Sequence, residues 1–367
     1  MTPLARLRRL WLDVHLWIGA GLLIVLVPLS VTGSILVWHD AIDRALYSQR
    51  YATSGALASR RVADYAAAAE QAFGPRARLF QLRLPQRAGD PVVAVGRIAG
   101  PPGPGGRPRT LNAWIDPPTA RVLDVAEVAQ QATMVVHRLH GSLLIQDVGR
   151  QVVGWLGWAM FVSSATGLWL WWPRHGGVLR ALRWRRGASQ LFNLHHMVGF
   201  WTCLPLAVLS LTGVYIAFPQ ASHALVGAPP PPVRSARQTP PLLDRPRLGV
   251  DQALAAASAE APGAVAQLDW PSQGRAPAWK LMPAGHGAPL QVEDATGLVS
   301  PARAPAERRA APDPTSRLMR QIHDGTDMGL AWRLVITAAG AMPTILGLSG
   351  LVMWLRRRAR RRALRAA

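Results

Sequence analysis

Apolar residues gather into four long stretches that contain no Asp, Glu, Lys or Arg. They are Val14 to His39, Gln151 to Pro173, Leu194 to Phe218 and Leu334 to Leu355. A helix needs about 20 apolar residues to cross the hydrocarbon core of a bilayer, which is about 30 Å thick. A soluble domain has no use for four uncapped apolar stretches of this length. The pattern predicts an α-helical integral membrane protein with four transmembrane helices, at residues 11–38, 149–173, 194–218 and 331–355.

Arginine residues are concentrated in the short segments next to these stretches. Residues 1–10, 174–193 and 356–367 contain many arginines and no acidic residue, whereas residues 39–148 and 219–330 mix both charges. Short Arg-rich segments stay in the cytoplasm, so we expect both termini and the 174–193 loop inside the cell and the two long segments outside it. The net charge of +21 then indicates contact with anionic lipid headgroups rather than binding of nucleic acid.

Short motifs recur at a nearly constant spacing. Residues 29–33 read Leu-Ser-Val-Thr-Gly and residues 209–213 read Leu-Ser-Leu-Thr-Gly, an offset of 180. Each long segment contains an Ala-rich amphipathic stretch, at Val62–Phe73 and at Val250–Ala261, followed by a strand–turn–strand pattern. We therefore expect two tandem repeats of span, α+β domain and span, with the domains at 39–148 and 219–330. A pseudo-two-fold axis along the membrane normal would relate the repeats.

Two histidines correspond at the offset of 180, and each begins a span on the expected cytoplasmic side. Each is followed by a glycine four residues later and by another eighteen residues later: His15 by Gly19 and Gly33, His195 by Gly199 and Gly213. These spacings are one and five helical turns, so each helix would carry its histidine and a flat trough on one stripe. A macrocycle fits such a trough, with the imidazole as an axial ligand of its iron. We expect His15 and His195 to bind one haem from both sides.

A second pair, His140 and His323, corresponds at an offset of 183 and precedes the second and fourth spans on the expected outer side. Two haems, one near each membrane surface, would form an electron path across the bilayer. His137 shares a face with His140 if the segment is helical. Alternatively, His137, His140 and His323 would bind a metal ion without a macrocycle. His196 points about 100° away from His195 and is a secondary candidate at the inner site.

These motifs together resemble the PepSY-associated transmembrane family. The similar segments read Val-His-Leu-Trp-Ile-Gly at 14–19, His-Arg-Leu-His-Gly at 137–141, Gly-Leu-Trp-Leu-Trp-Trp-Pro-Arg at 167–174, Leu-His-His-Met-Val-Gly at 194–199 and Leu-Thr-Gly at 211–213. The turns Asp-Pro-Pro-Thr at 116–119 and Asp-Ala-Thr-Gly at 294–297 are similar to those of PepSY domains. The family includes iron-regulated inner-membrane proteins and haem-containing ferric-siderophore reductases of Gram-negative bacteria. The resemblance implies haem b, a bacterial inner-membrane location and two periplasmic PepSY-like domains.

The first functional hypothesis is an oxidoreductase: an inner-membrane di-haem electron-transfer protein that reduces ferric siderophores or other ferric chelates in the periplasm during iron uptake. We expect a separate electron donor, either quinol or a cytoplasmic flavin reductase, because the sequence shows no counterpart of the reductase module that some family members carry. Two alternatives stay open, namely a non-enzymatic module that binds a periplasmic protein or peptide, and a metal or siderophore transporter. The uncharged spans argue against transport. No catalytic residue is assigned, and the Pro/Gly-rich insertion at 100–108 has no assigned role.

Overall fold

A computed structural model describes residues 2–55, 60–100, 108–173, 177, 182–183, 187, 189–228, 240–285, 288–302 and 314–366. The chain divides into two compact units, a helical unit (residues 1–39, 136–231 and 310–367) and a sheet unit (residues 40–135 and 232–309). Residues 101–107 of the Pro/Gly-rich insertion and most of the predicted basic loop at 174–193 lie outside the described residues.

Among the residues that the structure describes, three helices of the helical unit are long and apolar enough to cross a membrane, by length and composition. They are α6 (Gly149–Trp171), α8 (Gln190–Ala217) and α12 (Gly329–Ala366). Helices α1 (Pro3–Gly21) and α2 (Leu23–Leu36) meet the same test only as a pair, and they are bent by 70° where they meet. Three of the four predicted spans are thus single helices, and the bent pair lies where the straight span 11–38 was expected.

The bend has a local cause in the sequence. Gly19, Ala20 and Gly21 immediately precede the break, and glycine is among the weakest helix formers. At the offset of 180 the residue that corresponds to Gly21 is Trp201, and α8 continues through it without a break. The difference in glycine content therefore explains why the first apolar stretch bends and the third does not.

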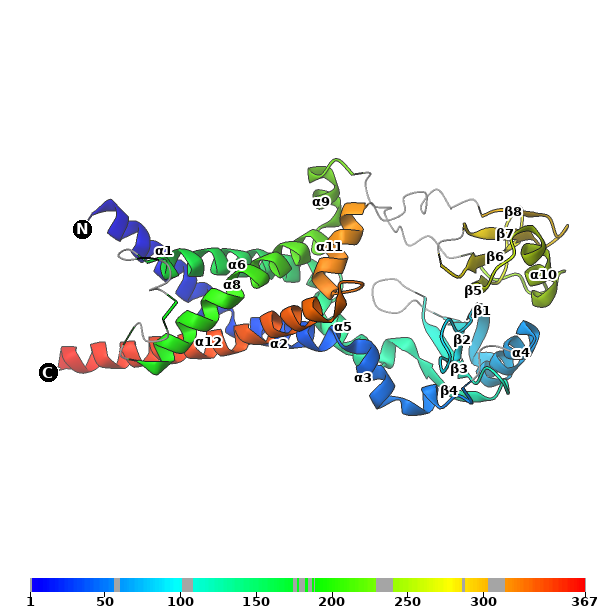
Figure 1. The fold of residues 1–367 in the computed structure, drawn as a ribbon, viewed down its shortest axis with the longest axis horizontal. Helices are drawn as coiled ribbons and strands as arrows, with labels where there is room; N and C mark the ends of the chain where they lie inside the picture. The colour runs from blue at the N-terminus through cyan, green and yellow to red at the C-terminus, as the bar shows by residue number, and fades with distance from the viewer. Residues whose placement is uncertain are drawn as a thin grey trace. The chain divides into compact units, whose positions relative to one another are not determined.

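The helices of the helical unit pack in a bundle. Helix α6 packs against α8 and α1, and α12 packs against α2 and α8. Both termini lie at one end of this bundle, and α5 (Ala132–Ser142) and α11 (Pro314–Asp324) lie at the other (Figure 1). Helices α5 and α11 lead into α6 and α12, respectively. Two further short helices, α3 (His39–Leu46) and α9 (Pro219–Leu225), follow α2 and α8.

The sheet unit contains one antiparallel sheet of eight strands in the order β4-β3-β2-β1-β5-β6-β7-β8. The strands are β1 (Ala77–Arg83), β2 (Val92–Ile98), β3 (Thr110–Ile115), β4 (Val122–Glu127), β5 (Val265–Asp269), β6 (Ala278–Pro283), β7 (Leu290–Glu293) and β8 (Val299–Pro301). Short 3₁₀ helices η1 (Ser48–Tyr51), η2 (Gly74–Arg76) and η4 (Val128–Gln130) flank them.

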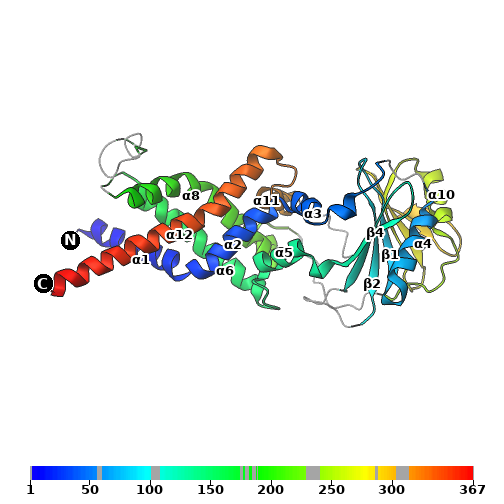
Figure 2. The ribbon, with the colours of Figure 1, turned by 90° about the horizontal axis from the view of Figure 1, so that it is seen from below.

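The sequence predicted two α+β domains, whereas the structure joins them through a single sheet. Strands β1 and β5 pair at three positions, with Leu82 opposite Leu268 at the centre. Both leucines are fully buried. Helices α4 (Val62–Phe73) and α10 (Val250–Glu260) form where the amphipathic stretches were predicted and pack on one face of this sheet (Figure 2). One hydrophobic core serves both halves. A lone half would also leave β1 or β5 as an unpaired edge.

The two repeated turns have a structural role. Asp116 follows β3, is fully buried, and accepts hydrogen bonds from the backbone and hydroxyl of Ser54 and from Thr119. Asp294 follows β7 and accepts from the backbone N–H groups of Arg247 and Leu248. A buried carboxylate is stable only when its oxygens are hydrogen-bonded. Each aspartate therefore fixes the turn to the segment that precedes a helix on the sheet.

Candidate functional site

The inner pair, defined as His15 and His195, comes together in the helical unit. His15 lies on α1 and His195 on α8, and the centres of their rings are 6.3 Å apart with the ring planes perpendicular, at 90°. The chain brings these residues together from positions 180 apart in sequence. The spacing of the repeated motifs predicted that they would face each other.

The outer pair, defined as His140 and His323, also comes together. His140 lies in the last turn of α5 and His323 in the last turn of α11. Their ring centres are 6.2 Å apart, and the ring planes are tilted by 41°. Burial lowers the pKa of both imidazoles below the usual value, which favours the neutral form that binds metals.

The separation within each pair matches the requirement for a metal held between two imidazoles. A ligating nitrogen lies about 2.0 Å from a metal such as zinc, and the ring centre lies behind that nitrogen. Two imidazoles on opposite sides of one metal ion therefore place their ring centres about 6 Å apart. The observed values of 6.3 Å and 6.2 Å agree with this geometry.

A hydroxyl residue followed by glycine, on a neighbouring helix, seats each histidine. The hydroxyl oxygen lies near Nδ1, at 3.2 Å for Thr166 and His15, 2.9 Å for Ser349 and His195, 3.4 Å for Thr32 and His140, and 3.0 Å for Thr212 and His323. Each hydroxyl donates its own hydrogen to a carbonyl one turn earlier, so its oxygen accepts from the imidazole. We call these four dipeptides the seats. They recur at offsets of 180 and 183. Their contact with the histidines was not predicted from the sequence.

For three of the histidines, a backbone carbonyl near the seat selects one tautomer of the imidazole. Nδ1 of His15 donates to the carbonyl of Ser163 at 3.0 Å, that of His140 to Leu29 at 2.9 Å, and that of His323 to Leu209 at 3.1 Å. When Nδ1 carries the hydrogen, Nε2 has its lone pair available for a metal. Metal-binding histidines are typically oriented by such a second hydrogen bond.

The seat glycines explain why each imidazole ring fits closely against the neighbouring helix that carries the seat. A Cβ built on Gly33 would lie 2.8 Å from Cε1 of His140, and one on Gly213 would lie 3.1 Å from Cε1 of His323. Gly167 and Gly350 make the same approach to His15 and His195, at 3.1 Å and 3.4 Å. The expected stripe is therefore divided: Gly33 and Gly213 lie against the outer pair, whereas a Cβ on Gly19 would meet nothing within 4 Å and one on Gly199 only Leu346 at 3.8 Å.

The two secondary candidates lie beside the pairs. His196 stacks between the rings of Trp171 and Phe192, with ring centres 5.9 Å and 5.4 Å away. His137 lies close enough to His140 for its charge to contribute to the lowered pKa of His140. The structure places His140 opposite His323.

Each pair offers fewer protein ligands than a zinc site uses. Protein-bound zinc usually takes four ligands, of which at least three are protein side chains. Among the described residues, no group of three or more His, Cys, Asp or Glu side chains could hold a metal ion. In a haem, the porphyrin supplies four nitrogen ligands of the iron, and the protein supplies up to two axial imidazoles. Each pair meets that smaller requirement.

The two pairs lie near opposite ends of one spanning helix. His195 is in the second turn of α8, and the seat of His323, Thr212 and Gly213, is near the end of the same helix. At a rise of about 1.5 Å per residue these positions are about 25 Å apart along the axis. This distance is close to the thickness of the hydrocarbon core of a bilayer, about 30 Å.

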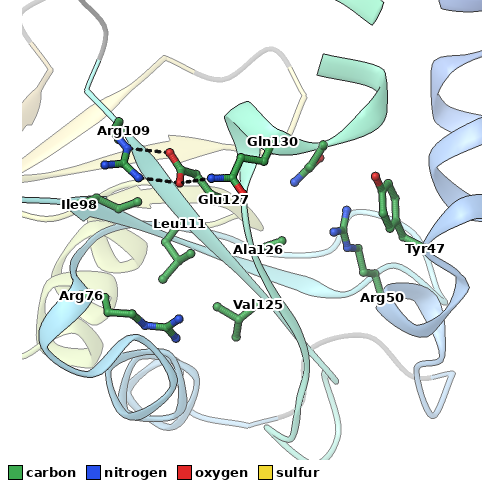
Figure 3. Close-up of a pocket in the computed structure, with 11 residues that line it drawn as sticks. Tyr47, Arg50, Arg76, Ile98, Arg109, Leu111, Val125, Ala126, Glu127 and Gln130 are labelled. Atoms are coloured by element: carbon green, nitrogen blue, oxygen red, sulfur yellow. Dashed lines mark hydrogen bonds and ion pairs between the residues drawn. The ribbon is translucent and has the colours of Figure 1, made fainter. Parts of the chain in front are cut away.

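The sheet unit has a pocket of its own, with a cavity of about 680 Å³. Ile98, Leu111 and Val125 form its apolar floor, and Arg109 binds the carboxylate of Glu127 through two hydrogen bonds (Figure 3). The bond from Arg109 holds the pKa of Glu127 below its usual range.

Arg50 lines the same pocket and is itself held firmly. It lies between the rings of Tyr47 and Trp114, with its guanidinium carbon 3.7 Å and 4.0 Å from the ring centres, and pairs with Asp124. The backbone N–H of Ala132, the first residue of α5, donates to the Tyr47 hydroxyl. The pocket thus combines an apolar floor with arginines that are paired with carboxylates.

Comparisons with known proteins bear on this arrangement. The family model described as PepSY-associated TM region matches residues 12–357. A curated protein of Pseudomonas aeruginosa named "Uncharacterized protein PA4219" is 31% identical over 149 residues, which make up 35% of this chain and 36% of that protein. The chain thus aligns with about a third of the length of this relative.

Proposed function

Because the chain belongs to the PepSY-associated TM region family of membrane proteins, we propose that it is an inner-membrane electron-transfer protein that holds two b-type haems. Haem iron between two imidazoles exchanges single electrons, and its potential is set by the ligands and their surroundings. His15 and His195 would hold the inner haem, and His140 and His323 the outer haem. The four seats fix the imidazoles with Nδ1 protonated and Nε2 directed away from the seat.

The observation that carries this proposal is the existence of two histidine pairs, each with the separation of axial ligands, near opposite ends of α8. A single pair would suit a structural metal or an isolated cofactor. Two pairs, one near each end of a membrane-spanning helix, provide two steps for an electron that crosses the bilayer. We propose further that the chain arose as two tandem repeats, since the offsets of 180 and 183 relate both the paired histidines and their seats.

We propose a ferric siderophore or another ferric chelate as the periplasmic acceptor, which gains one electron and becomes a ferrous chelate. The donor would be a separate partner, either quinol or a cytoplasmic flavin reductase. The pocket of the sheet unit favours a second candidate function, a non-enzymatic module that binds a periplasmic protein or peptide, because its floor is apolar and its rim carries guanidinium groups. Haem content separates the two functions.

The charge pattern yields a testable topology. The Arg-rich segments would lie in the cytoplasm and the sheet unit in the periplasm, with anionic lipids around the arginines. Alkaline phosphatase fused after residue 90 or residue 270 should be active, whereas the same enzyme fused after residue 183 should be inactive. A green fluorescent protein fused after residue 183 should fluoresce. A cytoplasmic signal from residue 90 or 270 would contradict this orientation and the proposed periplasmic acceptor.

The absorption spectrum of the purified full-length protein tests the proposed function directly. We expect a Soret band with the features of six-coordinate b-type haem, and about two haems per polypeptide by pyridine haemochrome. The outcome that would sink the electron-transfer proposal is a colourless, folded protein that takes up no added haem. That result would favour the binding module instead.

A further inference from the structure

Two arginines occupy the first turns of the spans that follow the outer histidines. Arg150 is the second residue of α6, and Arg333 is the fifth residue of α12. They are separated by 183 positions, which is also the offset between His140 and His323. Long arginine side chains near the ends of membrane helices usually reach toward the interface, and these two also bond to neighbouring helices.

Each arginine donates a hydrogen bond to a carbonyl near the end of a neighbouring helix. Arg333 donates to Val37, directly after α2, and Arg150 donates to Ile216, near the end of α8. Val37 lies one helical turn beyond Gly33, which seats His140, and Ile216 lies about one turn beyond Gly213, which seats His323. Each guanidinium group is therefore about one turn from a seat of the outer pair, toward the end of the helix.

Arg333 contacts the chain beside both outer histidines. In addition to its bond to Val37, its guanidinium carbon lies 4.5 Å from the centre of the Trp38 ring. On the other side, a Cβ built on Gly325, two residues after His323, would lie 3.0 Å from Cγ of Arg333. Among the described residues, no Asp or Glu forms an ion pair with Arg333. The bond to Val37 uses one of the five N–H donors of the guanidinium group.

We infer that Arg333, with Arg150 as its counterpart at the offset of 183, binds the carboxylates of the haem held between His140 and His323. This inference rests on the proposed function. Haem b carries two propionate carboxylates, and the planar fork of arginine matches a carboxylate through two parallel hydrogen bonds. The two arginines equal the two carboxylates in number, and among the described residues no Asp or Glu lies within ion-pair distance of Arg333.

The test compares the full-length protein with Arg333→Gln and Arg150→Gln in detergent or nanodiscs. We expect the propionate bending band of the outer haem to move in the resonance Raman spectrum, because that band reports hydrogen bonding to the carboxylates. The midpoint potential of the outer haem should fall, since a positive charge near the iron favours the ferrous state. Arg333→Lys should restore most of the potential but not the band, because lysine keeps the charge and loses the fork.

Arg8 provides a matched control, because it also donates to a carbonyl near a helix end, that of Leu170. Arg8→Gln should leave the outer-haem band unchanged, and the His140→Ala protein identifies which part of the band belongs to the outer haem. With two haems present, an unchanged band in Arg333→Gln overturns the inference and leaves Arg333 as a helix cap only. Absence of haem from the unaltered protein contradicts the proposed function instead.

Discussion

Replacing His140 or His323 with alanine should reduce the haem content from about two to about one per polypeptide. Each residue supplies one imidazole to the outer pair, and the inner pair shares no ligand with it. The remaining haem should still be reducible from the cytoplasmic side, whereas the reduction of a periplasmic ferric chelate should fall by about tenfold or more. Pyridine haemochrome assays and stopped-flow reduction measure the two effects.

A glycine variant tests the same site without removing a ligand. Gly33→Ala places a methyl group 2.8 Å from Cε1 of His140, so the ring must move, and we expect the outer haem to bind about 10- to 100-fold more weakly. Gly19→Ala is the matched control, because its Cβ would meet nothing within 4 Å.

If the unaltered protein and the His140→Ala and His323→Ala variants all contain one haem, the outer histidines serve a bare metal, a partner contact or the fold.

Replacing His15 or His195 with alanine should remove the inner haem and stop electron entry, with the outer haem retained. The two variants should lose the same fraction of haem, because either substitution leaves one imidazole where two are needed. Haem content and the rate of reduction by a cytoplasmic-side donor give the measurement. We expect chelate reduction by that donor to become undetectable, the largest change of any single substitution considered.

His196→Ala is the control for the inner pair. His196 is adjacent to His195 in sequence but stacks on Trp171 and Phe192 rather than facing His15. The substitution should therefore leave nearly all of the inner haem in place. A His196→Ala protein without inner haem, together with a His195→Ala protein that keeps it, would show that the ligand has been assigned one residue too early.

The pairing of the histidines was accessible from the sequence, because two constant offsets relate the residues of each pair. The offsets also contain the seats, since Thr32 and Thr212 belong to the repeated five-residue motif and Thr166 corresponds to Ser349. Their role was not readable, because a hydroxyl in a membrane helix usually bonds its own backbone. The histidine that each seat glycine faces depends on tertiary packing. The sequence argument placed Gly33 with His15 and Gly213 with His195, whereas they lie against His140 and His323.

The fold divides in the same way. Amphipathic period and turn residues predicted α4, α10 and the strands around Asp116 and Asp294. The pairing of β1 with β5 was not predicted, since nothing local in Ala77–Arg83 or Val265–Asp269 specifies the partner strand. The bend after Gly21 depends on two glycines in a segment whose hydropathy alone reads as one straight span.

The join between β1 and β5 bears on how such a chain could have originated. Each half of the chain supplies four strands of the sheet and one imidazole of each pair. A half-length ancestor would have had an open sheet edge, which favours pairing with another chain, and half of each ligand set. Two identical copies related by a two-fold axis would have completed both. Under the proposed duplication, the present chain would correspond to two such copies joined in one polypeptide, and the two members of each pair would be free to diverge independently.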